Sequence, residues 1–160
     1  MCIIIKPMSQ SSRTNKQFGS LQVSTTILTG SVVKSQTSIS TTSNAVTSAN
    51  SGTAFFLNSA SGSAISLPLP TSGFSCDFVV GTAPSSGNYI LSSGSANIYG
   101  AIVQPGNTSS SNVTSTSGGP TATVQLISGQ AKIGDYVFIK SDGTNFYASG
   151  FATGSGAKFL

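Results

Sequence analysis

From residue 49 onward, the chain consists of short apolar runs separated by Gly, Pro, Asn and Ser, and this pattern constrains its fold most strongly. The runs cover residues 53–57, 64–67, 74–80, 89–91, 97–103, 122–126, 136–139 and 145–149. Phe74, Cys76 and Phe78 alternate with other residues, which is the period of a half-buried strand. No segment after residue 20 has the i, i+3, i+4, i+7 spacing of an amphipathic helix. The pattern predicts an all-β fold, a compact antiparallel β-sandwich or barrel of the jelly-roll kind.

The composition favours the same fold class. Ser occupies 32 positions and Thr 18 of 160, while only 6% of the residues are charged, against roughly 25% in an ordinary globular protein. Ser, Thr and Gly are weak helix formers in helix interiors. Because charges are few, hydroxyl and amide groups must solvate the surface. Such a neutral surface is suited to permanent packing against neighbouring subunits.

Residues 1–48 differ from the rest of the chain because their large apolar residues are sparse. We interpret residues 1–48 as an extended, basic, Ser/Thr-rich N-terminal arm and residues 49–160 as the β-sandwich or barrel domain. Any strand within the arm is expected to pair only when docked, against its own domain or against a neighbouring subunit.

The formal net charge of +4 resides on the arm. Its basic residues are Lys6, Arg13, Lys16 and Lys34, and the first acid of the chain is Asp77. This asymmetry predicts an arm that docks on an acidic partner, with a solvated tail as the alternative. Nucleic acid is not the expected partner, because phosphate binding needs a denser basic stripe. No apolar run approaches the roughly 20 residues of a membrane span, so no membrane segment is expected.

Two places where Asp and Gly are adjacent predict structural turns. Asp142-Gly143 lies between two strand-like runs, and we expect a hairpin with a two-residue type I′ turn there. Gly134-Asp135 lies at the entrance of the preceding run. In both turns the Asp side chain is expected to accept hydrogen bonds from nearby backbone N–H groups.

The residues that carry catalysis or bind metals are scarce. The chain has no His and no Glu, and its only acids are Asp77, Asp135 and Asp142. A Ser–His–Asp triad is therefore impossible, and no loop has the carboxylates of a calcium site. Cys2 and Cys76 lack the spacing of a zinc site, and Cys76 is expected to be a buried apolar residue. We therefore expect no enzyme activity, no metal and no cofactor.

The C-terminal segment resembles a known kind of domain. Residues 134–150 read Gly-Asp, an alternating strand, Ser-Asp-Gly-Thr-Asn, an aromatic pair and a final Gly. This order is similar to the closing hairpin of small β-domains in virion proteins of tailed phages and large DNA viruses. Residues 64–68, a strand that ends at Leu-Pro, resemble an earlier element of those domains. Phe146 departs from the pattern, which usually carries Trp at this position.

The resemblance covers roughly residues 50–157 and implies a structural virion protein. The function implied is a capsid decoration (cement) or minor capsid protein that stabilises the shell through subunit contacts. The partners implied are the major capsid protein or other virion subunits, in a homotrimer on the capsid surface that assembles in the host cytoplasm. The alternative is the receptor-binding head of a fibre or spike.

Overall fold

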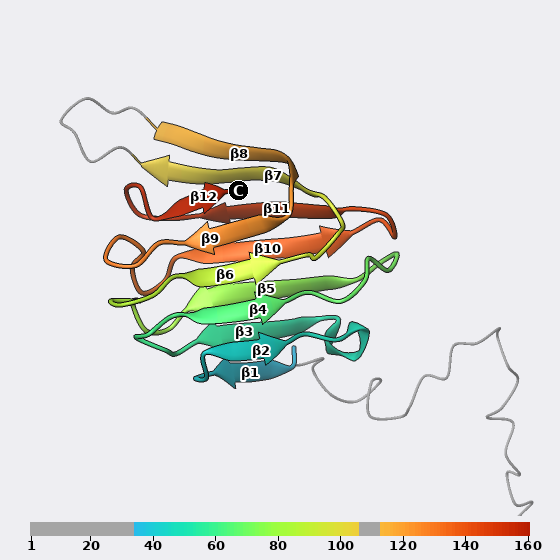
Figure 1. Cartoon of the computed structure of the whole chain (residues 1–160), viewed down its shortest axis with the longest axis horizontal. Coiled ribbons are helices and arrows are strands. Elements are labelled where there is room, and N and C mark those ends of the chain that lie inside the picture. The colour runs from blue at the N-terminus through green and yellow to red at the C-terminus, as the bar shows by residue number, and fades with distance from the viewer. Residues whose placement is uncertain (1–33, 106–112) are drawn as a thin grey trace, which may run out of the picture. The chain divides into compact units, whose positions relative to one another are not determined.

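The computed structural model describes residues 34–105 and 113–160, and residues 34–160 form one compact unit (Figure 1). Lys6, Arg13 and Lys16 lie outside the described residues. The strands are β1 (Gln36–Ile39), β2 (Ser43–Ala45), β3 (Thr53–Leu57), β4 (Ser63–Ser66), β5 (Ser75–Val80), β6 (Tyr89–Ser92), β7 (Ile98–Pro105), β8 (Val113–Thr121), β9 (Thr123–Leu126), β10 (Tyr136–Ser141), β11 (Phe146–Phe151) and β12 (Ala157–Phe159), with one short 3₁₀ helix, η1 (Ser48–Asn50).

The strands form two sheets that pack on one another. The seven-stranded sheet has the order β1-β3-β5-β10-β11-β7-β8, and the five-stranded sheet has the order β12-β9-β6-β4-β2. Side chains that alternate along each strand meet between the sheets in one hydrophobic core. The prediction of an all-β sandwich is therefore confirmed.

The direction of many strands differs from the antiparallel prediction. From β1 to β7 the chain passes alternately from one sheet to the other (Figure 1). Strands β1, β3 and β5 are consequently parallel in one sheet, and β2, β4 and β6 are parallel in the other. After each strand in one sheet, the chain forms a strand in the other sheet and then returns. The returning strand runs in the same direction as the strand it pairs with, so the pair is parallel. Antiparallel pairing joins β5 to β10 and β10 to β11 in the seven-stranded sheet, and β6 to β9 and β9 to β12 in the five-stranded sheet.

The core is built from cross-strand ladders of inward-facing side chains. Phe55 of β3 lies opposite Phe78 of β5, which lies opposite Val137 of β10. The rings of Phe55 and Phe78 stack with centroids 5.2 Å apart. Cys76 and Tyr89 are fully buried, and desolvation raises the pKa of the Cys76 thiol to about 12. At neutral pH Cys76 is therefore an unionised core residue.

Two segments outside the predicted strand runs form strands. Residues 36–45, placed in the arm, contribute β1 and β2, which pair with β3 and β4. Residues 104–120, which lie between two of the predicted runs and have no apolar period of their own, contain the end of β7 and most of β8. Strand β8 is the edge of its sheet and pairs with β7 through backbone groups, so it needs no apolar alternation. The edge position also tolerates Pro120.

The buried hydroxyl of Tyr89 connects the two sheets, and its removal yields the first prediction. The hydroxyl accepts the Ser59 N–H at 2.8 Å and faces the carbonyls of Leu57, Ser59 and Thr82 at 2.7–3.0 Å. Tyr89→Phe should lower the free energy of unfolding by about 1–3 kcal/mol, because it leaves a buried N–H without an acceptor. Urea denaturation measures this loss. The control, Tyr99→Phe in β7, removes a partly exposed hydroxyl and should change the value by less than about 0.5 kcal/mol. Equal effects of both variants would contradict the prediction.

Candidate interaction surface

Asp135 serves the structure of the loop before β10. It is 1% exposed, and its carboxylate accepts the Lys132 N–H at 2.8 Å. The same group accepts the N–H and the hydroxyl of Thr153 at 3.0 and 2.9 Å. The carboxylate therefore joins the loop before β10 to the turn after β11. Gly134, next to it, has φ +93°, a conformation that favours glycine.

The hairpin between β10 and β11 is present, but its turn lies one residue later than predicted. Ser141 pairs with Phe146, and the Asp142 N–H donates to the Asn145 carbonyl at 3.3 Å. The two central residues are therefore Gly143 and Thr144 rather than Asp142 and Gly143. Gly143 has φ +100°, which fits the glycine requirement at the first central position of a tight hairpin turn.

The Asp142 side chain, which directly precedes the two central residues, stabilises this turn. One oxygen accepts the N–H groups of Thr144 and Asn145 at 2.7 and 2.8 Å. The other accepts the Tyr147 hydroxyl at 2.8 Å. Hydrogen bonds from the backbone N–H groups of Asn145 and Thr144 lower the pKa of Asp142, and the hydrogen bond from the Tyr147 hydroxyl lowers it further. The hydrogen bond between Tyr147 and Asp142 also raises the pKa of Tyr147.

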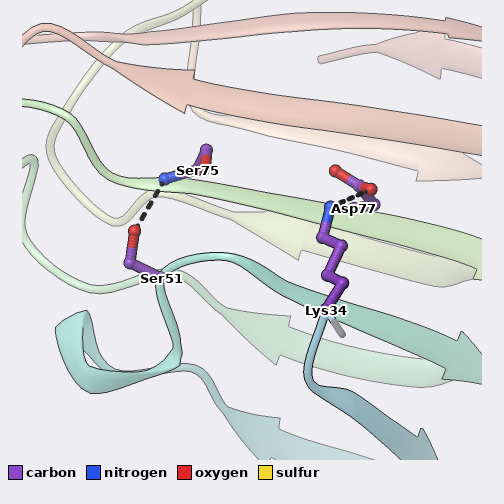
Figure 2. Close-up of polar contacts among 4 residues, drawn as sticks. All are labelled: Lys34, Ser51, Ser75 and Asp77. Carbon is purple, nitrogen blue, oxygen red and sulfur yellow. Dashed lines mark hydrogen bonds and ion pairs between the residues drawn. The ribbon is translucent and has the colours of Figure 1, made fainter. Parts of the chain in front are cut away.

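The third acid, Asp77, pairs with Lys34 on the outer face of the seven-stranded sheet. Figure 2 shows the Lys34 side chain reaching from the segment before β1 to Asp77 on β5. Strand β3 lies between them, and its Ala54 is opposite Asp77. The Ala54 side chain is small enough for the Lys34 side chain to pass over it. The Ser75 N–H of β5 also donates to the Ser51 hydroxyl at 3.2 Å (Figure 2). Lys34, assigned to the partner-docking arm, thus contacts an acid of its own domain.

An apolar row crosses the outer face of the seven-stranded sheet. Phe56, Val79, Tyr136, Phe151 and Val103 lie opposite one another on β3, β5, β10, β11 and β7. The Tyr136 ring lies 6.4 Å from the Phe151 ring. Val103 remains 41% exposed. These side chains point away from the core, where an ordinary antiparallel sandwich carries polar residues.

Further aromatic side chains lie beside this row. The Phe138 ring packs 4.7 Å from that of Tyr136, and Tyr99 and Tyr147 stack with centroids 6.2 Å apart. Phe138 is 38% exposed and Tyr147 is 45% exposed. We call the whole set the aromatic face; its members are Phe56, Val79, Tyr99, Val103, Tyr136, Phe138, Tyr147 and Phe151.

The outer face of the five-stranded sheet has a different chemistry. Its two cross-strand rows are Ser43, Ala64, Ile90, Gln125 and Lys158, and Ala45, Ser66, Ser92 and Thr123. Apart from Ile90, these side chains are small or polar. The two sheets therefore share a core but present unlike outer surfaces. A contiguous exposed apolar patch marks an interaction site, so the aromatic face is the candidate functional surface.

The sequence analysis missed the aromatic face, although a signal for it is present. Phe55-Phe56, Phe78-Val79-Val80 and Tyr136-Val137-Phe138-Ile139 are consecutive apolar residues in strands. Successive strand residues point to opposite faces, so such runs place apolar side chains on both sides of the sheet. The inward alternation alone does not reveal which outward positions of neighbouring strands come together.

The described residues show neither a metal-ligand cluster nor a membrane-spanning helix. Within residues 34–105 and 113–160, no three His, Cys, Asp or Glu side chains are grouped as metal ligands would be. No helix in that part of the chain has the length and apolar character to cross a membrane. In comparisons with known proteins, no family model, no curated protein and no solved structure matches the chain.

The lowered pKa of Asp142 yields a prediction about pH. A carboxyl whose pKa is lower in the folded state stabilises the fold above its ordinary pKa of 3.8, and this stabilisation is lost as the pH falls through the folded-state value. Asp142→Asn should therefore be less stable than the wild type at pH 7, and the difference should shrink below about pH 4. Chemical denaturation between pH 7 and pH 2 measures it. Tyr147→Phe, which removes one of the three donors, should show a smaller effect of the same sign. A difference that is independent of pH would contradict the prediction.

The Lys34–Asp77 ion pair yields a third prediction. Both side chains are partly exposed, at 42% and 26%, and exposed ion pairs contribute about 0–1 kcal/mol. Lys34→Ala should lower the free energy of unfolding by less than about 1 kcal/mol, and the loss should decrease at 1 M salt. Thermal denaturation in low and high salt measures both effects. A loss of several kcal/mol would show that Lys34 has a larger structural role than this pair.

Proposed function

We propose that this chain is a structural component of a virus or phage particle, a capsid decoration or minor capsid protein that acts through contact. The single observation that carries the proposal is the aromatic face of the seven-stranded sheet, which contrasts with the mostly small and polar outer face of the five-stranded sheet. An exposed apolar surface of this kind is favourable only where another protein covers it. The resemblance of residues 134–150 to virion β-domains is the reason for proposing a virus or phage particle as the assembly.

The positions of the acids support a structural role. Asp77 pairs with Lys34, Asp135 holds a loop to a turn, and Asp142 stabilises a hairpin. Each carboxylate therefore has a partner within the fold. Hydrogen bonds of this kind hold a carboxylate in place, whereas general acid–base catalysis needs a group that reaches a substrate proton.

The proposed partners are the major capsid protein or other virion subunits, with the chain on the capsid surface as a homotrimer. A surface with few charges allows many copies to pack closely on a shell without mutual repulsion. Lys6, Arg13 and Lys16 give the first 33 residues a charge of +3, which suits an acidic surface on the shell.

One observation favours the alternative, a receptor-binding fibre or spike head. Tyr99 and Tyr147 stack side by side with an interplanar angle of 29°, and Tyr147 is 45% exposed. Adjacent aromatic rings with a carboxylate beside them, here Asp142, form a platform on which a sugar ring can stack. A glycan array with the purified protein distinguishes the alternative, since a cement protein should bind no glycan.

The proposal predicts that purified particles of the encoding virus contain the chain and depend on it for stability. Particles stripped of the chain should lose integrity at a lower temperature, and added protein should restore it. The double variant Tyr136→Ser/Phe138→Ser should fail to restore it, because it lacks the centre of the aromatic face. Ile90→Ser, on the other outer face, should restore it fully. Particle melting followed by dye release measures the effect. Particles that lack the chain, or that melt identically without it, would contradict the proposal.

A further inference from the structure

We infer that the aromatic face binds a second copy of this chain. The inference rests on the proposed function and names the partner for the same surface. Two faces that each expose Phe138, Tyr136 and Val103 would pack against one another and remove these side chains from water. The resulting face-to-face dimer would then replace the homotrimer as the unit that decorates the particle.

The first argument is the area of the face. A standard interface buries about 800 Å² on each partner, of which roughly 450–500 Å² is non-polar. Phe and Tyr side chains bury about 150–250 Å² each, and Phe138 and Tyr147 are 38% and 45% exposed. With Val103 and the partly exposed members, the face presents apolar area on the order of 400 Å². The aromatic face therefore supplies most of the apolar area that a stable contact between two copies needs.

The second argument is charge. The Lys34–Asp77 pair lies on the face and is neutral as a pair. Besides this pair, Lys140 is the one charged residue among the outward-facing residues of the described strands β3, β5, β10, β11 and β7. It lies opposite Tyr147 on the neighbouring strand. A surface with so little net charge meets its own copy without like-charge repulsion. An acidic protein or a nucleic acid would instead be recognised by a basic surface.

The third argument is the aromatic character of the face. Interfaces are enriched in Tyr and Phe at their centres, and a few such residues contribute most of the binding energy. Tyr136 lies between Phe138 and Phe151, with ring centroids 4.7 and 6.4 Å away. This cluster occupies β10 and β11, the middle of the seven-stranded sheet. It is therefore placed where a contact with another sheet face would be most completely shielded from water.

Residues 1–33 of the same chain are the competing occupant. They join the domain at Lys34, whose side chain lies on this outer face (Figure 2). Their larger apolar residues include Ile3, Ile4, Ile5, Phe18, Leu21, Val23, Ile27, Leu28, Val32 and Val33. The same segment carries three positive charges, whereas Asp77 is the only acid in the described cross-strand rows of the face and is already paired with Lys34. Charge therefore gives residues 1–33 no attraction to this face, and a second copy of the face is the better match. The experiment below distinguishes the two occupants in the full-length chain.

The test is sedimentation velocity of the full-length protein from 1 to 50 µM. The wild type should be a dimer, because two like faces that cover one another form a closed pair. Tyr136→Ser/Phe138→Ser should weaken association by roughly 100-fold or more, since interface hot spots contribute at least about 2 kcal/mol each. Ile90→Ser, the matched control on the other outer face, should associate like the wild type. Circular dichroism checks that each variant is folded, and Phe138→Ser alone serves if the double variant is not.

Three results would overturn the inference. A wild type that is a monomer or a trimer at 50 µM would do so, as would a folded face variant that associates like the wild type. The third is a full-length Leu21→Ser/Val23→Ser/Ile27→Ser variant that loses association to the same extent as the face variant, which would assign the face to residues 1–33. The inference expects this variant to remain associated. Because these measurements use isolated protein, they can fail while the chain still stabilises particles, and the particle experiment can fail while the protein still self-associates.

Discussion

The structure depends on one constraint, the single core that both sheets share. Because the chain crosses from sheet to sheet between β1 and β7, each strand must direct alternate side chains toward the same interior. Leu57, Phe78 and Leu91 are fully buried as a result. Tyr89 satisfies the constraint with a polar group, since its hydroxyl bonds to the backbone at the end of β3 and to Ser59. Burial of the inward positions provides the stability, and the outward positions are left free for other roles.

The two sheets use that freedom differently. The outer face of the five-stranded sheet carries small and polar side chains, as a solvated face should. The seven-stranded sheet has apolar residues on both faces along β3, β5 and β10, a pattern typical of strands that are covered on both sides. Its outer apolar residues add nothing to the shared core of the monomer. They lower the free energy of the protein only when another surface covers them, which is the physical basis for an assembly role.

The sequence predicted the strands better than it predicted their directions. Thr53–Leu57 was expected as a strand and forms β3, because alternation toward a core is visible in the residues themselves. Parallel pairing was missed, since alternation has period two in both directions and the direction depends on which sheet the intervening strand joins. Strand β8 was missed because its pairing with β7 uses backbone groups, which every residue type provides. The hairpin turn was displaced by one residue because the Asp142 side chain accepts the N–H groups of Thr144 and Asn145.

At the β1 edge of the seven-stranded sheet and the β2 edge of the five-stranded sheet, assembly by strand addition is unfavourable. An exposed edge invites strand addition, which can continue without limit, unless the edge is short and polar. Strand β1 has four residues, with Gln36, Thr37 and Ser38 exposed, and β2 has three residues. The Asn44 side chain of β2 bonds to Thr41 and Ser63. These edges are poor templates for a further strand, whereas two aromatic faces in mutual contact cover one another completely. Contact between like faces gives a closed oligomer of defined size, and a component that decorates a particle in a fixed number of copies requires such closure.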